Sequence, residues 1–173
     1  MLTGSLSLKT IKEQQIQGNW WNIVYQPLGF LIFFICAMAE CNRAPFDLPE
    51  AESELNMGYH QEYSSMKLGF FLFAEYINMF ISCTILATLY FGGYDMPFVD
   101  ESNLPGITAM IVGLIAIFGK TFILIFIFMW IRWTLPRFRY DQLMNLGWKG
   151  LIPLAILNML ITAVVVLLTM KTH

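Results

Sequence analysis

The sequence predicts an all-α, polytopic membrane protein with about four transmembrane helices and a structured acidic cytoplasmic loop. Of its 173 residues, 57% are hydrophobic and only 13% are charged, whereas about 25% of the residues of a soluble domain are charged. Four apolar runs are long enough to cross a hydrocarbon core, which takes about 20 helical residues. Helices are expected because an open strand in lipid would leave its backbone groups without hydrogen bonds.

The four spans form a single membrane domain over residues 1–173 and are expected near 23–41, 68–91, 107–131 and 150–170. The first is the weakest, since Gln26 and Pro27 lie near its start and Glu40 near its end.

Several residues in and beside the spans have structural roles in this prediction. Trp20 and Trp21 before the first span are placed as interfacial aromatic anchors, as are Trp130 and Trp133 at the end of the third. Small residues let helices approach closely. We expect this of Gly113 and Gly119, and a hydrogen bond across helices from Asn158.

The distribution of Lys and Arg predicts the orientation. Segments 42–67 and 132–149 together hold six of these residues, whereas the other side has three. The positive-inside rule therefore places both segments in the cytoplasm or in an organelle's matrix. Segment 92–106 and both termini are expected on the opposite side. The stretch 137–149 fits either a short interfacial helix or an ordered loop.

Acidic residues are concentrated between the first two spans, beginning with AECNRAPFDLPEAESEL at 39–55. Seven of the chain's 12 acidic residues lie within 36 positions: Glu40, Asp47, Glu50, Glu52, Glu54, Glu62 and Glu75. Charge at a bilayer is costly, and ionisable groups there are functional candidates by default.

The spacing of these residues suggests proton exchange. Arg43 follows Glu40 by three residues and would share its helix face, while Glu50 and Glu54 would share another. Crowded carboxylates raise one another's pKa, which brings proton exchange closer to neutral pH. The alternative is a solvated loop with no proton role.

Two ionisable residues lie deep within spans. Glu75 is about 10 Å inside the second span by helix rise and should face protein or water, with Tyr76 and Asn78 nearby as hydrogen-bonding groups. Lys120 lies near the middle of the third span, where snorkelling reaches an interface poorly. We expect it to have a buried partner, either Glu75 or a carboxylate on another chain.

Other functional classes have little support. Cys36, Cys41 and Cys83 lack metal-site spacing, and only two histidines are present, so no metal site is expected. Basic patches with interleaved aromatics are missing, which argues against nucleic-acid binding. Without a nucleotide-binding Gly-rich motif or cluster-type cysteines, the chain is not expected to carry a redox centre.

Two long stretches resemble a known family. AECNRAPFDLPEAESEL followed by GYHQEYSSMKLGFFLFAEY, and later RWTLPRFRYDQLMNLGWKGLIPL, closely resemble the quinone-chamber membrane subunit of respiratory complex I. This family comprises the H subunit of NADH-quinone oxidoreductase, which is called subunit 1 in mitochondria. The match covers nearly the whole chain but corresponds only to the family's last four spans of about eight.

The resemblance implies a subunit without redox centres in a proton-pumping translocase. Quinone would be the substrate, and iron–sulfur clusters and FMN would lie in partner subunits of the peripheral and membrane arms. The protein would lie in the bacterial inner membrane, or in the mitochondrial inner membrane if the chain is organellar. The seven acids and Lys120 would couple quinone reduction to proton translocation, while Arg43 and Arg139 would tune charge in the quinone chamber.

Three other functions remain open. One is the equivalent subunit of a membrane-bound hydrogenase-type complex, which uses no quinone. Another is a transporter-like proton or cation channel, which would need oligomerisation to shield its charges from lipid. The third is a purely structural anchor for peripheral subunits.

Overall fold

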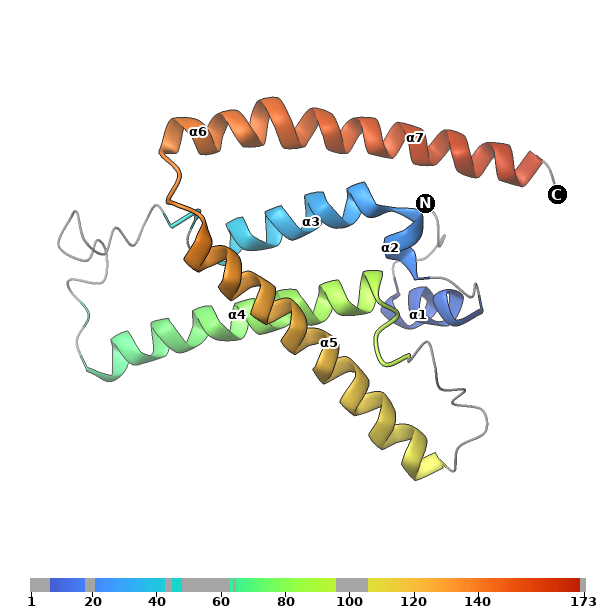
Figure 1. Cartoon of the computed structure of the whole chain (residues 1–173), viewed down its shortest axis with the longest axis horizontal. Helices are drawn as coiled ribbons and strands as arrows, with labels where there is room; N and C mark the ends of the chain where they lie inside the picture. The colour runs from blue at the N-terminus through green and yellow to red at the C-terminus, as the bar shows by residue number, and fades with distance from the viewer. Residues whose placement is uncertain are drawn as a thin grey trace.

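The computed structural model describes residues 7–17, 21–42, 45–47, 63, 65–95 and 106–171. All regular elements within these ranges are helices, which confirms the all-α prediction (Figure 1). They are α1 (Leu8–Gln17), α2 (Asn22–Tyr25), α3 (Pro27–Glu40), α4 (Met66–Tyr90), α5 (Gly106–Thr134), α6 (Tyr140–Asn145), the π-helical η3 (Leu146–Leu151) and α7 (Ile152–Lys171).

Among the described residues, three helical segments are long and apolar enough to cross a membrane. They are α4, α5 and the continuous segment Tyr140–Leu168 that joins α6, η3 and α7. The predicted spans 68–91 and 107–131 therefore correspond closely to α4 and α5. The last predicted span, 150–170, is the second part of a helix that begins ten residues earlier.

The first predicted span, 23–41, is interrupted and forms two helices. Its break is at Gln26, whose backbone has φ −136° and ψ 65°. A proline disfavours helical geometry in the residue before it, and its own ring suits the first position of a helix. Pro27 accordingly begins α3, which has 14 residues and is about 21 Å long. This helix is apolar but shorter than the other three segments.

The segment 137–149 is mainly helical rather than a loop. Helix α6 begins at Tyr140 and passes directly into η3 and α7. Within η3 the N–H of Ile152 donates to the carbonyl of Gly147, five residues back. Pro153 has no N–H to donate, and a proline ring clashes with the carbonyl four residues before it. The wider π turn lies directly before this proline and accommodates it.

The helices form an open arrangement in which α3 lies between α4 and α7, and α5 crosses α4 obliquely (Figure 1). With 29 residues, α5 is about 43 Å long. A helix longer than a hydrocarbon core of about 30 Å is accommodated by tilt. The end of α3, the start of α4, the end of α5 and the start of α6 gather at one end of the molecule. We call this the loop end, and it agrees with the shared side predicted for segments 42–67 and 132–149.

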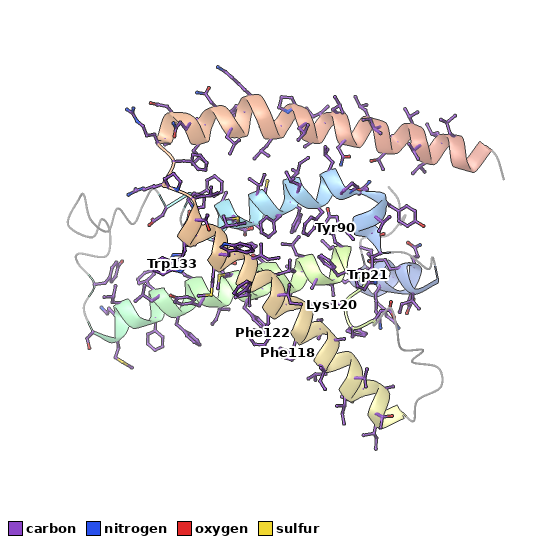
Figure 2. The ribbon with its side chains drawn as sticks, viewed as in Figure 1. Trp21, Tyr90, Phe118, Lys120, Phe122 and Trp133 are labelled. Carbon is purple, nitrogen blue, oxygen red and sulfur yellow. The ribbon has the colours of Figure 1, made fainter. Side chains whose placement is uncertain are left out.

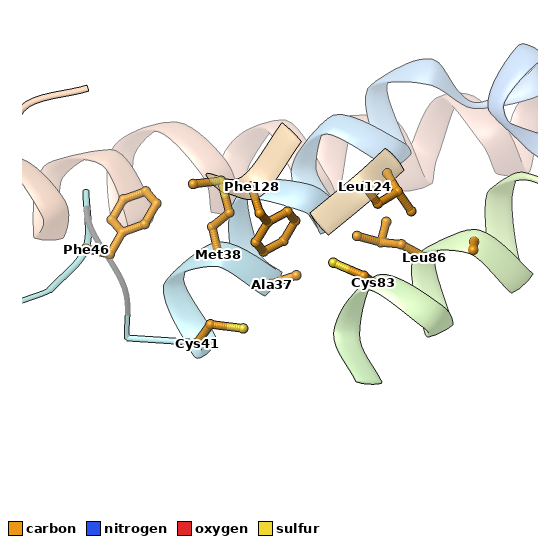
Figure 3. Packing of buried hydrophobic residues seen from close by; sticks show 9 residues of the cluster. Ala37, Met38, Cys41, Phe46, Cys83, Leu86, Leu124 and Phe128 are labelled. Atoms are coloured by element: carbon orange, nitrogen blue, oxygen red, sulfur yellow. The ribbon is translucent and has the colours of Figure 1, made fainter. Parts of the chain in front are cut away.

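The core lies where α3, α4 and α5 meet (Figure 3). Cys83 and Leu86 of α4 are fully buried, and Leu124 of α5 is 2% exposed. Phe128 of α5 packs edge-on against Phe34 of α3, with ring centroids 4.8 Å apart. These contacts hold the middle of α4 against α3 and α5, so the position of α4 relative to both helices is fixed.

Candidate functional site

The structure describes five of the ten predicted site residues. Glu40 is exposed at the last position of α3, and Asp47 is half-buried just beyond it. Glu75 and Lys120 are half-buried in α4 and α5, and Arg139 is exposed before α6. The other predicted residues lie outside the described ranges: Arg43, Glu50, Glu52, Glu54 and Glu62.

Glu75 lines a small cavity among α3, α4 and α5, near the loop end of the molecule. The cavity has a volume of about 20 Å³, room for about one water molecule. Arg132 from the last turn of α5 lines it as well. The other lining residues are Met38, Cys41, Tyr76, Met79, Phe128 and Met129.

This position confirms the expectation that Glu75 faces protein, because the carboxylate oxygen Oε2 is fully buried. Of the two neighbours expected for Glu75, Tyr76 lines the same cavity, whereas Asn78 is not among its lining residues. Opposite charges on Glu75 and Arg132 attract across an apolar cavity more strongly than they would in water. The cavity therefore places a carboxylate, a guanidinium and a phenol beside one water-sized space, a set of groups that can bind a polar molecule or pass a proton.

Arg132 was not predicted as a site residue, because it served only in the count of Lys and Arg that predicts membrane orientation. The usable signal was its position: it ends the apolar run of the third span, twelve residues after Lys120.

The start of the acid-rich segment is attached to the chain that follows α5. The N–H of Phe138 donates to the carbonyl of Pro45 over 3.0 Å. The rings of Phe46 and Phe138 also stack, with centroids 5.6 Å apart and an interplanar angle of 28°. Pro45 and Phe46 are buried. The two long stretches that carry the family resemblance therefore touch each other at the loop end.

Arg139 follows this contact and begins α6. Its backbone N–H donates to Oε1 of Gln142 over 3.2 Å, which satisfies one of the open donors at the helix start. Its side chain is exposed at the same end of the molecule as the Glu75 cavity.

Lys120 lies in a different part of the structure, at the C-terminal end of α4 (Figure 2). Its ammonium donates to the carbonyls of Phe91 over 2.7 Å, of Gly93 over 3.0 Å, and of Asp95. It also lies 4.8 Å from the centre of the Trp21 ring. An ammonium has three N–H bonds, so each of them has a carbonyl acceptor.

The predicted pairing of Lys120 with Glu75 is therefore wrong. Glu75 precedes Phe91 by sixteen residues, about 24 Å along a helix, whereas the ammonium is in contact with Phe91. The ammonium instead meets the backbone of the turn that follows α4, which ends at Tyr90. A carboxylate on another chain, the other partner expected for Lys120, stays a prediction.

Other polar side chains cover the same end of α4. Gln15 of α1 donates to the carbonyls of Thr88 and Leu89 over 3.3 and 3.0 Å, and Asn22 donates to that of Leu89 over 2.9 Å. Trp21 packs edge-on against Phe91, with centroids 5.8 Å apart. Trp21 thus has protein contacts in addition to the interfacial position predicted for it.

The predictions of close helix contact at two glycines and of a hydrogen bond in the last span have different outcomes. Gly113 is buried, and a Cβ atom there would lie 3.2 Å from that of Tyr94, so this glycine does permit close contact. Gly119 has no such neighbour within 4 Å. A hydrogen bond from the last span to another part of the chain was expected at Asn158. The structure places one at Thr162 instead, whose hydroxyl accepts from the side-chain amide of Gln26 over 3.0 Å.

Groups of three or more metal-ligating side chains are not found among the described residues.

Comparison with known proteins gives the family. A sequence model described as NADH dehydrogenase matches residues 1–163. The chain belongs to this family. It is 61% identical over 168 residues to an H subunit (H 1) of the NADH-quinone oxidoreductase of Cytophaga hutchinsonii, covering 97% of this chain and 49% of that protein.

Other relatives carry similar names. The H subunit of the NADH-quinone oxidoreductase of Flavobacterium psychrophilum is 61% identical over 170 residues, which is 97% of this chain and 49% of the relative. NADH-quinone oxidoreductase subunit 8 of Rhodothermus marinus is 46% identical over 171 residues, with 92% and 50% covered. The chain thus spans about half the length of the curated relatives it matches.

Proposed function

We propose that this chain forms part of the quinone-reduction chamber of a proton-pumping NADH:quinone oxidoreductase and helps couple quinone reduction to proton translocation. The observation that carries the proposal is the Glu75 cavity, which joins Glu75 and Arg132 at the end of the molecule where the acid-rich segment begins. Family membership supports it, because the relatives are named for a reaction between NADH and quinone.

In this proposal Glu75 holds or passes a proton at its carboxylate, and the guanidinium of Arg132 lines the same water-sized space. The cavity has room for about one water molecule, which suits the passage of a proton, and the quinone itself would bind outside it. The acids that continue the path toward the loop are Glu40, Asp47, Glu50, Glu52, Glu54 and Glu62, with Arg43 and Arg139 tuning their charge.

The contact between Phe138 and Pro45 supports a mechanical link between these parts. A change at the cavity that moves the end of α5 would also move Phe138, and through it the start of the acid-rich segment. Partner subunits would supply the electrons through iron–sulfur clusters and FMN. The assembly would lie in the cytoplasmic membrane of a bacterium, as the organisms of the relatives suggest.

The test is Glu75→Gln in the assembled complex, with Glu13→Gln as the matched control. Glu13 is exposed on α1 and paired with Lys9, far from the cavity. We expect Glu75→Gln to lower NADH:quinone reductase activity by roughly a hundredfold, typical for loss of a positioned proton-transferring group, with assembly intact. The control should retain full activity. Normal turnover and normal proton pumping in Glu75→Gln would contradict the proposal.

A further inference from the structure

A lysine in the middle of a transmembrane helix invites a role in proton transfer, but the contacts of Lys120 also fit a positioning role. Its three N–H bonds are directed to the carbonyls of Phe91, Gly93 and Asp95. These hydrogen bonds join α5 to the chain that follows α4. A charge held by fixed backbone acceptors can act through its position.

The turn that supplies these carbonyls is built to receive the ammonium. Gly92 and Gly93 have positive φ angles of 73° and 63°, which L side chains rarely adopt. This conformation closes the turn back onto α4, because the N–H of Gly93 donates to the carbonyl of Ala87 over 3.1 Å. On α5, Gly113 lets Tyr94 of the same turn pack closely two helical turns before Lys120.

The two helices joined by Lys120 meet again at the Glu75 cavity. Along α4, Glu75 lies sixteen residues before Phe91, and along α5, Arg132 lies twelve residues after Lys120. These separations are about 24 and 18 Å of helix. Both helices are held together between these points by the buried side chains of Leu86 and Leu124. The contact of Lys120 with the turn after α4 therefore sets how far α4 and α5 extend toward the Glu75 cavity.

We propose that Lys120 is a positioning residue: its ammonium clamps α5 to the C-terminal turn of α4 and so sets the register of Glu75 against Arg132. The activity measurements that test this inference rest on the proposed function. The position of Glu75 relative to Arg132 can be measured without it. The proton of Lys120 stays on its nitrogen throughout the reaction. Slippage by one helical turn would move Glu75 by about 5.4 Å relative to Arg132.

The first test removes the ammonium. In the assembled complex, Lys120→Met should lower quinone reductase activity by about tenfold to a hundredfold, the scale expected when a remote change misplaces a reacting group by about 1 Å. Protons pumped per quinone reduced and the pH at which activity is maximal should stay as in the unmodified complex. The matched control is Lys12→Met, since Lys12 lies beside the same turn but contacts the Tyr94 ring, 3.4 Å from its centre. It should have normal activity.

The second test perturbs the clamp from the acceptor side without changing any ionisable group. A Cβ atom on Gly93 would lie 3.2 Å from Cγ2 of Thr88 and require a strained φ. We expect Gly93→Ala to reproduce the Lys120→Met defect in milder form, a loss of several-fold in activity. Gly119→Ala is its control, because open space surrounds that position. This pair decides the question even if Lys120→Met prevents assembly.

Chemical rescue and direct structure determination complete the design. The activity of Lys120→Ala should recover with propylammonium, which has three N–H bonds, and not with tetramethylammonium, which has none. Electron cryo-microscopy of Lys120→Met should show the Glu75–Arg132 separation changed relative to the unmodified complex. An unchanged separation, or a shifted pH optimum in Lys120→Met with full activity in Gly93→Ala, would overturn the proposal. A changed separation in a complex whose Glu75→Gln variant is fully active would instead keep the clamp and reject the proposed function.

Discussion

Two ionisable side chains lie near opposite ends of the α4–α5 pair, Glu75 within α4 and Lys120 beside the turn that follows it, and their surroundings differ. At the loop end, Glu75 lines a water-sized cavity that Arg132 also lines. At the other end, Lys120 contacts a turn of backbone carbonyls and the face of Trp21. The first arrangement leaves space for a small molecule, whereas the second surrounds the ammonium with backbone acceptors. We propose from this difference that Glu75 takes part in proton exchange and that Lys120 positions α5.

The largest expected effect on stability comes from the core that connects the two ends. Leu86 is fully buried between α3, α4 and α5, so Leu86→Ala should destabilise the packing by about 3 kcal/mol through the cavity it leaves. Thermal inactivation of the assembled complex measures this as a lower midpoint. Leu167→Ala on α7, where the side chain is 68% exposed, is the control and should change little. Equal midpoints for the two variants would mean that the core does not hold the ends together.

A smaller effect is expected at the loop end. Phe138→Ala removes the stack on Phe46 but keeps the backbone hydrogen bond to Pro45, and aromatic pairs contribute about 1 kcal/mol beyond their buried area. We expect quinone reductase activity to fall several-fold, because the acid-rich segment loses part of its attachment. Trp133→Ala, at an 82% exposed side chain, is the control. If Phe138→Ala keeps full activity, the attachment has no part in function.

The smallest effect on turnover is expected beside Lys120. Gln15 is 4% exposed and donates to two carbonyls at the end of α4. Replacing it with leucine removes these hydrogen bonds, each with a net contribution of about 1 kcal/mol, while Lys120 remains in place. The thermal midpoint should fall slightly and turnover should stay normal. A loss of turnover as large as that of Lys120→Met would show that the clamp depends on α1 rather than on the ammonium.

The parts of the fold that the sequence predicted are those governed by long apolar runs. The spans 68–91 and 107–131 correspond to Met66–Tyr90 and Gly106–Thr134 because bilayer thickness and backbone hydrogen bonding determine them. The break at Gln26 was visible as a weakness, since Gln26 and Pro27 stand out in the first run. The continuous helix through η3 was not predicted, because a mixed basic and apolar stretch fits both a helix and a loop.

The candidate site was predicted in part for a similar reason. Glu75 was identified because an acid within an apolar run is conspicuous, and its position against protein follows from the cost of facing lipid. The partners of Lys120 could not be predicted, since backbone carbonyls leave no side-chain signal in a sequence. Arg132 was overlooked because a basic residue at the end of a span also fits the positive-inside rule.

The most direct test of the difference between the two ends is the pH dependence of NADH:quinone reductase activity in Glu75→Gln and Lys120→Met, measured side by side in the assembled complex. If Glu75 exchanges protons and Lys120 only holds α4 in place, the profile of Glu75→Gln changes shape, and that of Lys120→Met is lowered uniformly at every pH. A changed profile in Lys120→Met, or an unchanged one in Glu75→Gln, would contradict this division of roles.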